Sequence, residues 1–292
     1  MSALASRATH WLPKLVVAPS FVLSLLFIYG FIAWNGYLSL SASRLLPNYE
    51  FVGLAQYEAL FVNERFHVAL KNMVVFGGLF ITGAMAIGVL LAVLLDQKVR
   101  AEGVLRTVYL YPMAISFIVT GTAWKWILNP GTGLESVLRG WGFENFAFGW
   151  LVEPDMAIYC VVIAGVWQSA GFVMALFLAG LRGIDESIIK AAQVDGASLP
   201  RIYWSIILPS LGPVFFSTLM VVSHLAIKSF DLVMALTAGG PGFATDLPAT
   251  FMYAHAFTRG QIGLGAASAM VMLATVAAIV VPYLYSELRS KR

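Results

Sequence analysis

The sequence is short of charge and nearly devoid of cysteine, and each shortage excludes a class of protein. Only 11% of its 292 residues are Asp, Glu, Lys or Arg while 60% are hydrophobic, which is not the composition of a water-soluble domain. The single cysteine, Cys160, excludes an intrachain disulfide and a metal site made of several thiolates. The four histidines are scattered without ligand spacing, so we expect no metal centre: His10, His67, His224 and His255.

Two further absences concern chemistry. No Gly-x-x-x-x-Gly-Lys-Ser/Thr phosphate loop occurs, so we do not expect this chain to bind ATP by that route. The hydrophobic segments carry no catalytic dyad, and we expect neither a catalytic residue nor a bound cofactor. Energy for any uphill process therefore has to come from a partner.

Long hydrophobic runs dominate what is present. A bilayer core about 30 Å thick needs roughly 20 apolar residues per helix, and a helix satisfies its own backbone hydrogen bonds in lipid. We therefore predict an all-α integral membrane protein with six transmembrane helices surrounded by membrane lipid. The six segments are 13–38, 70–95, 105–128, 156–181, 207–236 and 262–286.

The distribution of basic residues predicts the orientation. Eleven Lys and Arg residues fall on the side of the N-terminus and five on the other side, and basic loops stay in the cytoplasm. We expect both termini to be cytoplasmic, with a C-terminal tail at 287–292. The net charge of +3 then reflects topology and does not indicate a nucleic-acid partner.

The cytoplasmic segment 182–206 is predicted to form a short helix, a turn and a second helix. Asp185 is expected to cap the first helix, with Glu186 in its first turn, and Gly196 is expected to end it. Ser198 can cap the second helix, with Pro200 in its first turn. An apolar face recurs at helical spacing, and it either faces the cytosol or packs the hairpin on the protein's own helices or the lipid surface: Ile184, Ile188, Ile189 and Ala192.

The residues of this segment resemble the signature loop of permease subunits in binding-protein-dependent ABC importers. The match consists of Ala191-Ala192, Gly196 and Ile206-x-Leu208-Pro209, placed before the penultimate span. One position departs from the family, because Lys190 stands where a glutamate is usual. The resemblance implies contact with an ATPase subunit for Ala191, Ala192, Asp195, Gly196, Ala197, Leu208 and Pro209.

Other motifs resemble the sugar branch of these permeases. Phe230-Asp231 and the run 236–241 look like a signature of the maltose-type and glycerol-phosphate-type subfamily. Further matches of that kind are 11–19 and 51–57. Four phrases look like glucose/mannose permease subunits of proteobacteria: 109–113, 122–126, 226–231 and 282–289.

The resemblance implies an architecture and a set of partners. It implies the MetI-like fold of type I ABC importers, with an N-terminal segment at 1–69 and a core permease domain at 70–286 in a bacterial inner membrane. It also implies ATPase subunits that use ATP and Mg, a second homologous permease, a periplasmic solute-binding protein and a hexose as cargo. Glycerol phosphate or an oligosaccharide are alternative substrates.

Polar groups in the fifth span are candidates for a translocation pathway. Ser217, His224, Lys228 and Asp231 are spaced by seven, four and three residues, which predicts one helix face. Ionisable side chains within a span usually face the bundle interior or a wet cavity. A purely structural ion pair between Lys228 and Asp231 is the other interpretation. A third is a proton relay in an ion-coupled transporter, although such carriers commonly show internal repeats and none is evident.

Two further spans offer weaker candidates. Trp124 can stack on a sugar ring or belong to an interfacial belt with Trp126. Trp167 and Gln168 lie in mid-span, where the amide can bind sugar hydroxyls or form an interhelical hydrogen bond. A stripe of small residues, Ala84 with its neighbours 88 and 92, predicts close helix packing.

Overall fold

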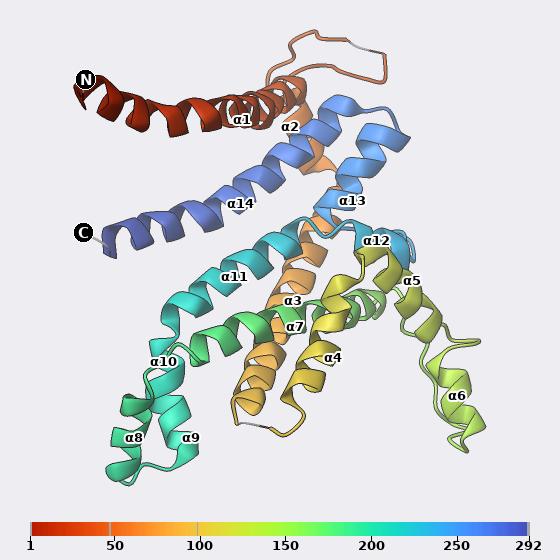
Figure 1. Ribbon diagram of the computed structural model, residues 1–292. Helices are drawn as coiled ribbons and strands as arrows, with labels where there is room; N and C mark the ends of the chain where they lie inside the picture. The colour runs from red at the N-terminus through yellow and green to blue at the C-terminus, as the bar shows by residue number, and fades with distance from the viewer. Residues whose placement is uncertain (1, 47, 98, 291–292) are drawn as a thin grey trace. The chain divides into compact units, whose positions relative to one another are not determined.

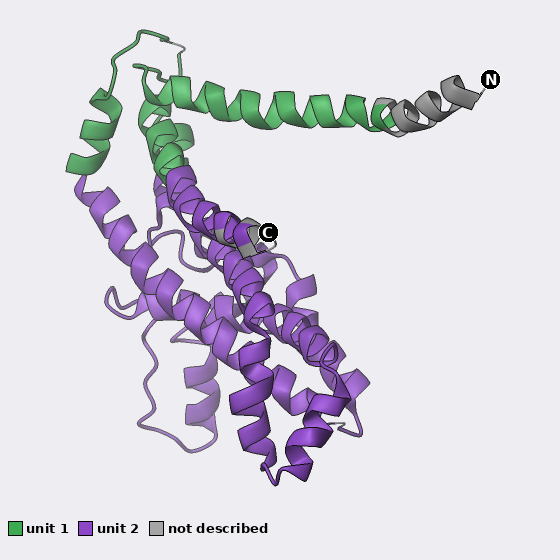
Figure 2. Cartoon of the chain, turned by 90° about the vertical axis from the view of Figure 1, so that its left-hand side faces the viewer, with its two compact units in different colours: residues 1–62, 252–271 green, residues 63–251, 272–292 purple. Residues whose placement is uncertain are grey.

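The chain is almost entirely helical in a computed structural model that describes residues 2–46, 48–97 and 99–290. The side chains of residues 2–13, 15, 286–288 and 290 lie outside the description, as do residues 291 and 292 of the predicted tail. The chain divides into two compact units, residues 1–62 with 252–271 (unit 1) and residues 63–251 with 272–292 (unit 2) (Figure 2).

Unit 1 contains the first long helix and the turn that follows it. Its elements are α1 (Ser2–Ser39), α2 (Ala55–Val62), the π-helix η2 (Ala254–Thr258), and the first residues of α14 (Ile262–Ser290). The loop after α1 is tied down by Gln56, whose Nε2 donates to the carbonyl oxygen of Ser41 over 2.9 Å. The backbone N–H of Gly263 donates to the carbonyl oxygen of Ser43 over 2.9 Å. Most apolar side chains of α1 are exposed.

Unit 2 holds the remaining helices, labelled in Figure 1, and the part of α14 from Met272 on (Figure 2). They are α3 (Glu64–Asp96), α4 (Glu102–Ala114), α5 (Phe117–Ile127), α6 (Leu134–Gly140), α7 (Ala157–Leu181), α8 (Glu186–Val194), α9 (Leu199–Ile202), η1 (Tyr203–Ile207), α10 (Leu208–Ser210), α11 (Gly212–Ile227), α12 (Asp231–Leu236) and most of α13 (Pro248–Tyr253). Asn63 starts α3, because its side-chain oxygen accepts from the N–H groups of Arg65 and Phe66.

Close packing of α3 on α7 forms the centre of unit 2. A Cβ on Gly88 would lie 2.4 Å from the Cβ of Val173 on α7, so only glycine permits this approach. Ala84 and Ala92, one turn on either side, are fully buried. The predicted stripe of small residues is therefore confirmed, and its partner is a helix of the same chain.

Within the described part of the chain, four helices are long and apolar enough to cross a membrane by themselves: α1, α3, α7 and α14. Two further spans are bent pairs, α4 with α5 at 100° and α9–α10 with α11 at 68°. Counting each pair as one span confirms the six predicted spans. The expectation that 105–128 and 207–236 are continuous helices is wrong.

The bends have local causes. Pro112 lies in the last turn of α4, and Ser116 starts α5 by accepting a hydrogen bond from the N–H of Val119 over 3.3 Å. The second bend falls at Leu211, between Pro209 and Pro213, whose rings remove two backbone donors. Hydropathy does not reveal either bend, because all pieces are apolar.

Candidate functional site

The segment 182–206 folds into a helical hairpin, here called the hairpin, in which α8 and α9 stand beside each other beyond α7 and α10 (Figure 1). Asp185 caps α8 through the N–H of Ser187 over 2.8 Å, and this bond lowers the pKa of the Asp185 carboxyl. Gly196 adopts φ +78° and ends α8. These predictions are confirmed. Ser198 occupies the cap position of α9, but its side chain makes no capping bond.

The hairpin packs most of its apolar face on the protein's own helices. Ala192 is 7% exposed, and Ile184 and Ile189 pack against the core of unit 2. Of the two interpretations, packing on the chain itself is confirmed for these three residues, because the short helices need the face for their own attachment. The exposed apolar side chains are instead Ile188, Val194, Leu199 and Trp204.

The residues matched to the family loop divide between these faces. Ala191, Asp195 and Gly196 are exposed, Ala192 is buried, and Ala197 is half-buried against the core. Leu208 and Pro209 lie in α10, beyond the hairpin and within the bent span. The exposed members are the ones that a docked partner can contact directly.

Lys190, the departure from the family pattern, pairs within α8. Its Nζ lies 2.9 Å from Oε2 of Glu186, one turn earlier, and both side chains are about 70% exposed. A pair of this kind contributes little to stability. The Lys190 side chain therefore lies on the solvent-facing side of the hairpin.

The end of the hairpin is joined to α3. The hydroxyl of Tyr203, the first residue of η1, donates to the Asp96 carboxylate at the end of α3. Nε2 of the adjacent Gln97 donates to the same hydroxyl oxygen over 2.7 Å. The Tyr203 hydroxyl thus accepts a hydrogen bond from Gln97 and donates one to Asp96, so both residues at the end of α3 hold it.

The start of the hairpin is joined to α4. Arg182, which follows α7, places Nη2 2.6 Å from Oε1 of Glu102 in the first turn of α4. Arg106 contacts the same carboxylate oxygen over 2.5 Å. The hairpin is therefore attached at both of its ends to neighbouring spans.

The polar stripe predicted for the fifth span does not exist as one helix face. The α11 helix ends at Ile227, and Asp231 begins a separate helix, α12. Ser217 and His224 share α11, whereas Lys228 caps it and Asp231 lies beyond it. All four side chains are exposed in the isolated chain. The spacing gave a wrong prediction because α11 ends at Ile227, before the apolar run of the sequence ends.

Lys228 and Asp231 lie on either side of the break between α11 and α12. Both line a small pocket of about 40 Å³, together with Phe117 and Leu225. The ion pairs found among residues 2–46, 48–97 and 99–290 include none between Lys228 and Asp231. The interpretation of a structural ion pair therefore has no contact to support it.

Gln168 lines a second pocket, of about 280 Å³, between α4, α5, α7 and α11. It is 4% exposed, and its Nε2 donates to the carbonyl oxygen of Ile115 over 2.7 Å. Its Oε1 is buried without a partner among the residues that the structure describes. Phe117 and Leu225 line this pocket and the Lys228 pocket alike, so the two are adjacent.

Trp124 and Trp167 face elsewhere. Their ring centroids lie 5.8 Å apart in an edge-to-face arrangement, on an apolar pocket of about 820 Å³ between α3, α4, α5 and α7. Trp167 and Gln168 therefore line different pockets, although they are neighbours on α7. Trp126 is 71% exposed, as expected for a belt residue.

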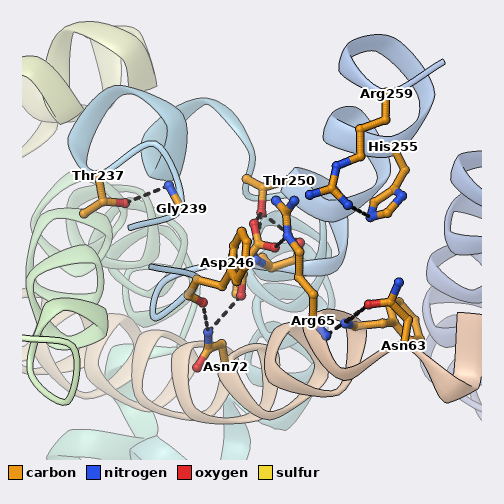
Figure 3. Close-up of polar contacts among 12 residues, drawn as sticks. Asn63, Arg65, Asn72, Thr237, Gly239, Asp246, Thr250, His255 and Arg259 are labelled. Carbon is orange, nitrogen blue, oxygen red and sulfur yellow. Dashed lines mark hydrogen bonds and ion pairs between the residues drawn. The ribbon is translucent and has the colours of Figure 1, made fainter. Parts of the chain in front are cut away.

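A buried ion pair near the N-terminal end of α3 was not predicted. Arg65 Nε lies 2.6 Å from Oδ2 of Asp246, and their side chains are 15% and 1% exposed. Thr250 donates to the other carboxylate oxygen over 2.6 Å, and Asn72 Nδ2 donates to the Asp246 carbonyl over 3.0 Å (Figure 3). Arg65 and Asp246 are 181 residues apart, so no local sequence pattern predicts the pair.

The same cluster fixes the loop that follows α12. Ala238 and Gly239 have positive φ angles, and the Gly240–Pro241 bond is cis. Thr245 Oγ1 donates to the carbonyl oxygen of Gly240 over 2.9 Å and lies 2.7 Å from the hydroxyl of Thr237. The threonine-glycine-glycine-proline motif therefore encodes a tightly held turn.

These features define a helical membrane protein with a hairpin attached to its core. The chain belongs to the family of binding-protein-dependent transport system inner membrane components, whose model matches residues 84–290. It is thus a transport subunit of the inner membrane rather than an enzyme.

Curated relatives cover nearly the whole chain. A probable ABC transporter permease of Pyrococcus horikoshii is 39% identical over 93% of this chain and 94% of its own length. The xylose/arabinose import permease XacH of Haloferax volcanii is 35% identical over 91% and 85%. The sn-glycerol-3-phosphate permease UgpA of Agrobacterium fabrum is 32% identical over 92% of both chains.

A solved structure has the same fold. A chain of a bacterial ABC transporter that imports alginate superposes with a TM-score of 0.85 at 20% identity, covering 99% of both chains. The predicted all-α permease fold is therefore confirmed.

Proposed function

We propose that this chain is the membrane-spanning subunit of an ATP-driven importer for a sugar, with a glucose- or mannose-type hexose as the cargo. The observation that carries the proposal is the pocket of Gln168. A buried amide oxygen without a partner is costly, and a sugar hydroxyl that donates to it removes that cost. Sugar motifs in the sequence and the pentose-importing relative XacH support a carbohydrate.

The pathway proposed here runs between the two adjacent pockets. Gln168 and Ser169 offer hydrogen-bonding groups, Phe117 offers a ring shared by both pockets, and Lys228 and Asp231 lie at the far side. Ser217 and His224, exposed on α11, extend the polar surface. A second, homologous permease would cover these exposed groups.

The hairpin is the proposed site of energy input. Its exposed residues Ala191, Asp195 and Gly196 would contact an ATPase subunit that uses ATP and Mg. Its buried residues Ala192 and Ala197 attach it to the core, and Leu208 and Pro209 begin the bent span to which it leads. ATP binding would then tilt the spans and change the side from which the pocket opens.

The distribution of basic residues indicates on which side of the membrane each part of the chain lies. The hairpin carries Arg182, Lys190 and Arg201, so it and both termini are proposed to lie in the cytoplasm. A periplasmic solute-binding protein would dock on the opposite side and deliver the sugar.

Glycerol phosphate is the main competing substrate, since UgpA is a relative. A phosphate carries close to two charges and favours paired cations, whereas Lys228 is the only cation among the described residues that line either pocket. The observed lining therefore favours an uncharged cargo.

The test is uptake by proteoliposomes that contain the complete importer, with labelled glucose, mannose, xylose, a maltooligosaccharide and glycerol 3-phosphate. We expect ATP-dependent uptake of a hexose that a protonophore does not abolish. Uptake that needs a proton gradient and survives without ATP would establish an ion-coupled carrier instead. Uptake of glycerol 3-phosphate alone would overturn the sugar assignment.

A further inference from the structure

The α3 helix connects two distant polar attachments of unit 2. It runs unbroken for 33 residues from Glu64 to Asp96, which corresponds to about 50 Å at 1.5 Å per residue. It contains no proline, whereas both bent spans contain one at or beside the bend.

At its first end, α3 holds the loop 237–247. Arg65 and Asn72 lie seven residues apart, on one face of the helix. Arg65 binds the Asp246 carboxylate, and its guanidinium carbon lies 4.3 Å from the ring centroid of Phe243. Asn72 Nδ2 donates to the carbonyl oxygens of Asp246 and Phe243 over 3.0 and 3.4 Å. The loop therefore cannot shift without pulling on α3.

At its last end, α3 holds the base of the hairpin. The Asp96 carboxylate accepts a hydrogen bond from the Tyr203 hydroxyl, and Gln97 donates to the same hydroxyl oxygen. Tyr203 directly follows α9, and the neighbouring Ile202 and Ile207 are 0% and 1% exposed. The hydroxyl contact thus joins α3 to a rigid part of the hairpin.

Between these ends, α3 is supported along its length by α7. Gly88 allows contact with Val173, and a Cβ on Gly83 would lie 2.9 Å from Val166. Close packing of this kind resists local bending, since packed cores deform little. A displacement at one end of α3 is therefore transmitted to the other end.

We propose that α3 transmits the state of the loop 237–247 to the hairpin, with Arg65–Asp246 and Asp96–Tyr203 as its two positioning pairs. A protein that docks on the loop, such as a loaded solute-binding protein, shifts α3 and through Tyr203 reorients the hairpin. The inference rests on the proposed role of the hairpin in contacting the ATPase.

The test uses the complete importer in proteoliposomes and measures ATP hydrolysis with and without the loaded binding protein. Tyr203→Phe removes the hydroxyl–carboxylate bond, and Asp96→Asn replaces its charged acceptor by a neutral amide oxygen, in both cases while preserving size. We expect basal hydrolysis to stay at the wild-type rate and its stimulation by the binding protein to fall about tenfold, as for loss of a hydrogen bond to a charged group. The double variant should be no worse than either single variant, because both break one contact.

Controls separate this outcome from general damage. Tyr37→Phe removes a comparable hydroxyl bond, from Tyr37 to the carbonyl oxygen of Tyr49 over 3.0 Å in unit 1, and should retain stimulation. Asp96→Glu keeps the acceptor and should recover part of it. Stimulation that persists in both Tyr203→Phe and Asp96→Asn, or a proportional fall of basal and stimulated rates, overturns the inference.

A hairpin variant distinguishes failure of this inference from failure of the proposed function. If Gly196→Val abolishes uptake but Tyr203→Phe retains full stimulation, the hairpin couples to ATP hydrolysis without α3. If Gly196→Val changes neither uptake nor hydrolysis, the proposed role of the hairpin itself is wrong.

Discussion

Gln168 on α7 donates through Nε2 to the carbonyl oxygen of Ile115 over 2.7 Å, at the bend between α4 and α5. The bend leaves this carbonyl without a helical partner, and Gln168 supplies one. The same side chain keeps its Oε1 buried and unbonded within the described part of the chain. One amide thus stabilises the bend and keeps a second hydrogen-bonding group unused beside the pocket that Gln168 lines.

Replacement of Gln168 by methionine, which has a similar shape, tests the pocket. The variant loses both the bond to Ile115 and the free acceptor, and we expect uptake to fall about tenfold, corresponding to one hydrogen bond. Competition assays with deoxy sugars should show that wild type discriminates against one missing hydroxyl and that Gln168→Met does not. Equal discrimination by both proteins would contradict a sugar contact at Gln168.

Lys228→Met tests the charge at the break between α11 and α12. Because Lys228 has no ion pair with Asp231 in the described residues, its loss should leave thermal stability within about 0.5 kcal/mol of wild type. Uptake should fall several-fold if the side chain lines the pathway. The measurements are initial uptake rate and co-purification of the complex. Unchanged uptake with unchanged assembly would remove Lys228 from the pathway.

Two substitutions of Gly196 separate backbone geometry from bulk. The residue has φ +78°, and a Cβ there would meet nothing within 4 Å. Asparagine tolerates this conformation, whereas valine does so at a cost of about 1–2 kcal/mol. We expect Gly196→Val to insert into the membrane but to uncouple hydrolysis from uptake, and Gly196→Asn to retain more coupling. Equal loss in both variants would indicate that the ATPase needs an empty position rather than the turn.

Arg65→Met tests the buried ion pair. It leaves the Asp246 carboxylate buried without its cation, which typically costs about 3–5 kcal/mol. Thermal unfolding of the purified protein should show a clearly lower midpoint. Lys190→Met, which breaks the exposed pair with Glu186, is the matched control and should change stability by less than about 1 kcal/mol. Similar midpoints for both variants would contradict the stabilising role of Arg65.

The sequence predicts those features that local chemistry determines. Apolar length predicted the six spans, and Asp185 and Gly196 predicted the limits of α8, because a cap and a left-handed residue act within one turn. The sequence did not predict the bends at Ser116 and Leu211 or the end of α11 at Ile227, because apolar composition continues through all three positions.

Contacts between distant residues lie beyond such patterns. Asp246 and Arg65 are separated by 181 residues, and Tyr203 and Asp96 by 107. Which side the apolar face of the hairpin covers stayed open for the same reason. Periodicity shows that Ile184, Ile189 and Ala192 share a face, but only the tertiary fold shows that this face covers the core.

The most direct test of the central claim, that the hairpin docks on an ATPase subunit, is site-directed cross-linking from Val194. This side chain is 87% exposed, and the native Cys160 is fully buried, so Val194→Cys provides the accessible thiol of the hairpin. With a thiol-reactive photo-cross-linker on the complete importer, we predict a covalent product with the ATPase subunit whose yield changes when ATP is bound. Trp126→Cys, at an exposed residue outside the hairpin, is the control. The account would be contradicted if Val194→Cys gave no product with the ATPase subunit, or a product with lipid alone, and Trp126→Cys gave the same result.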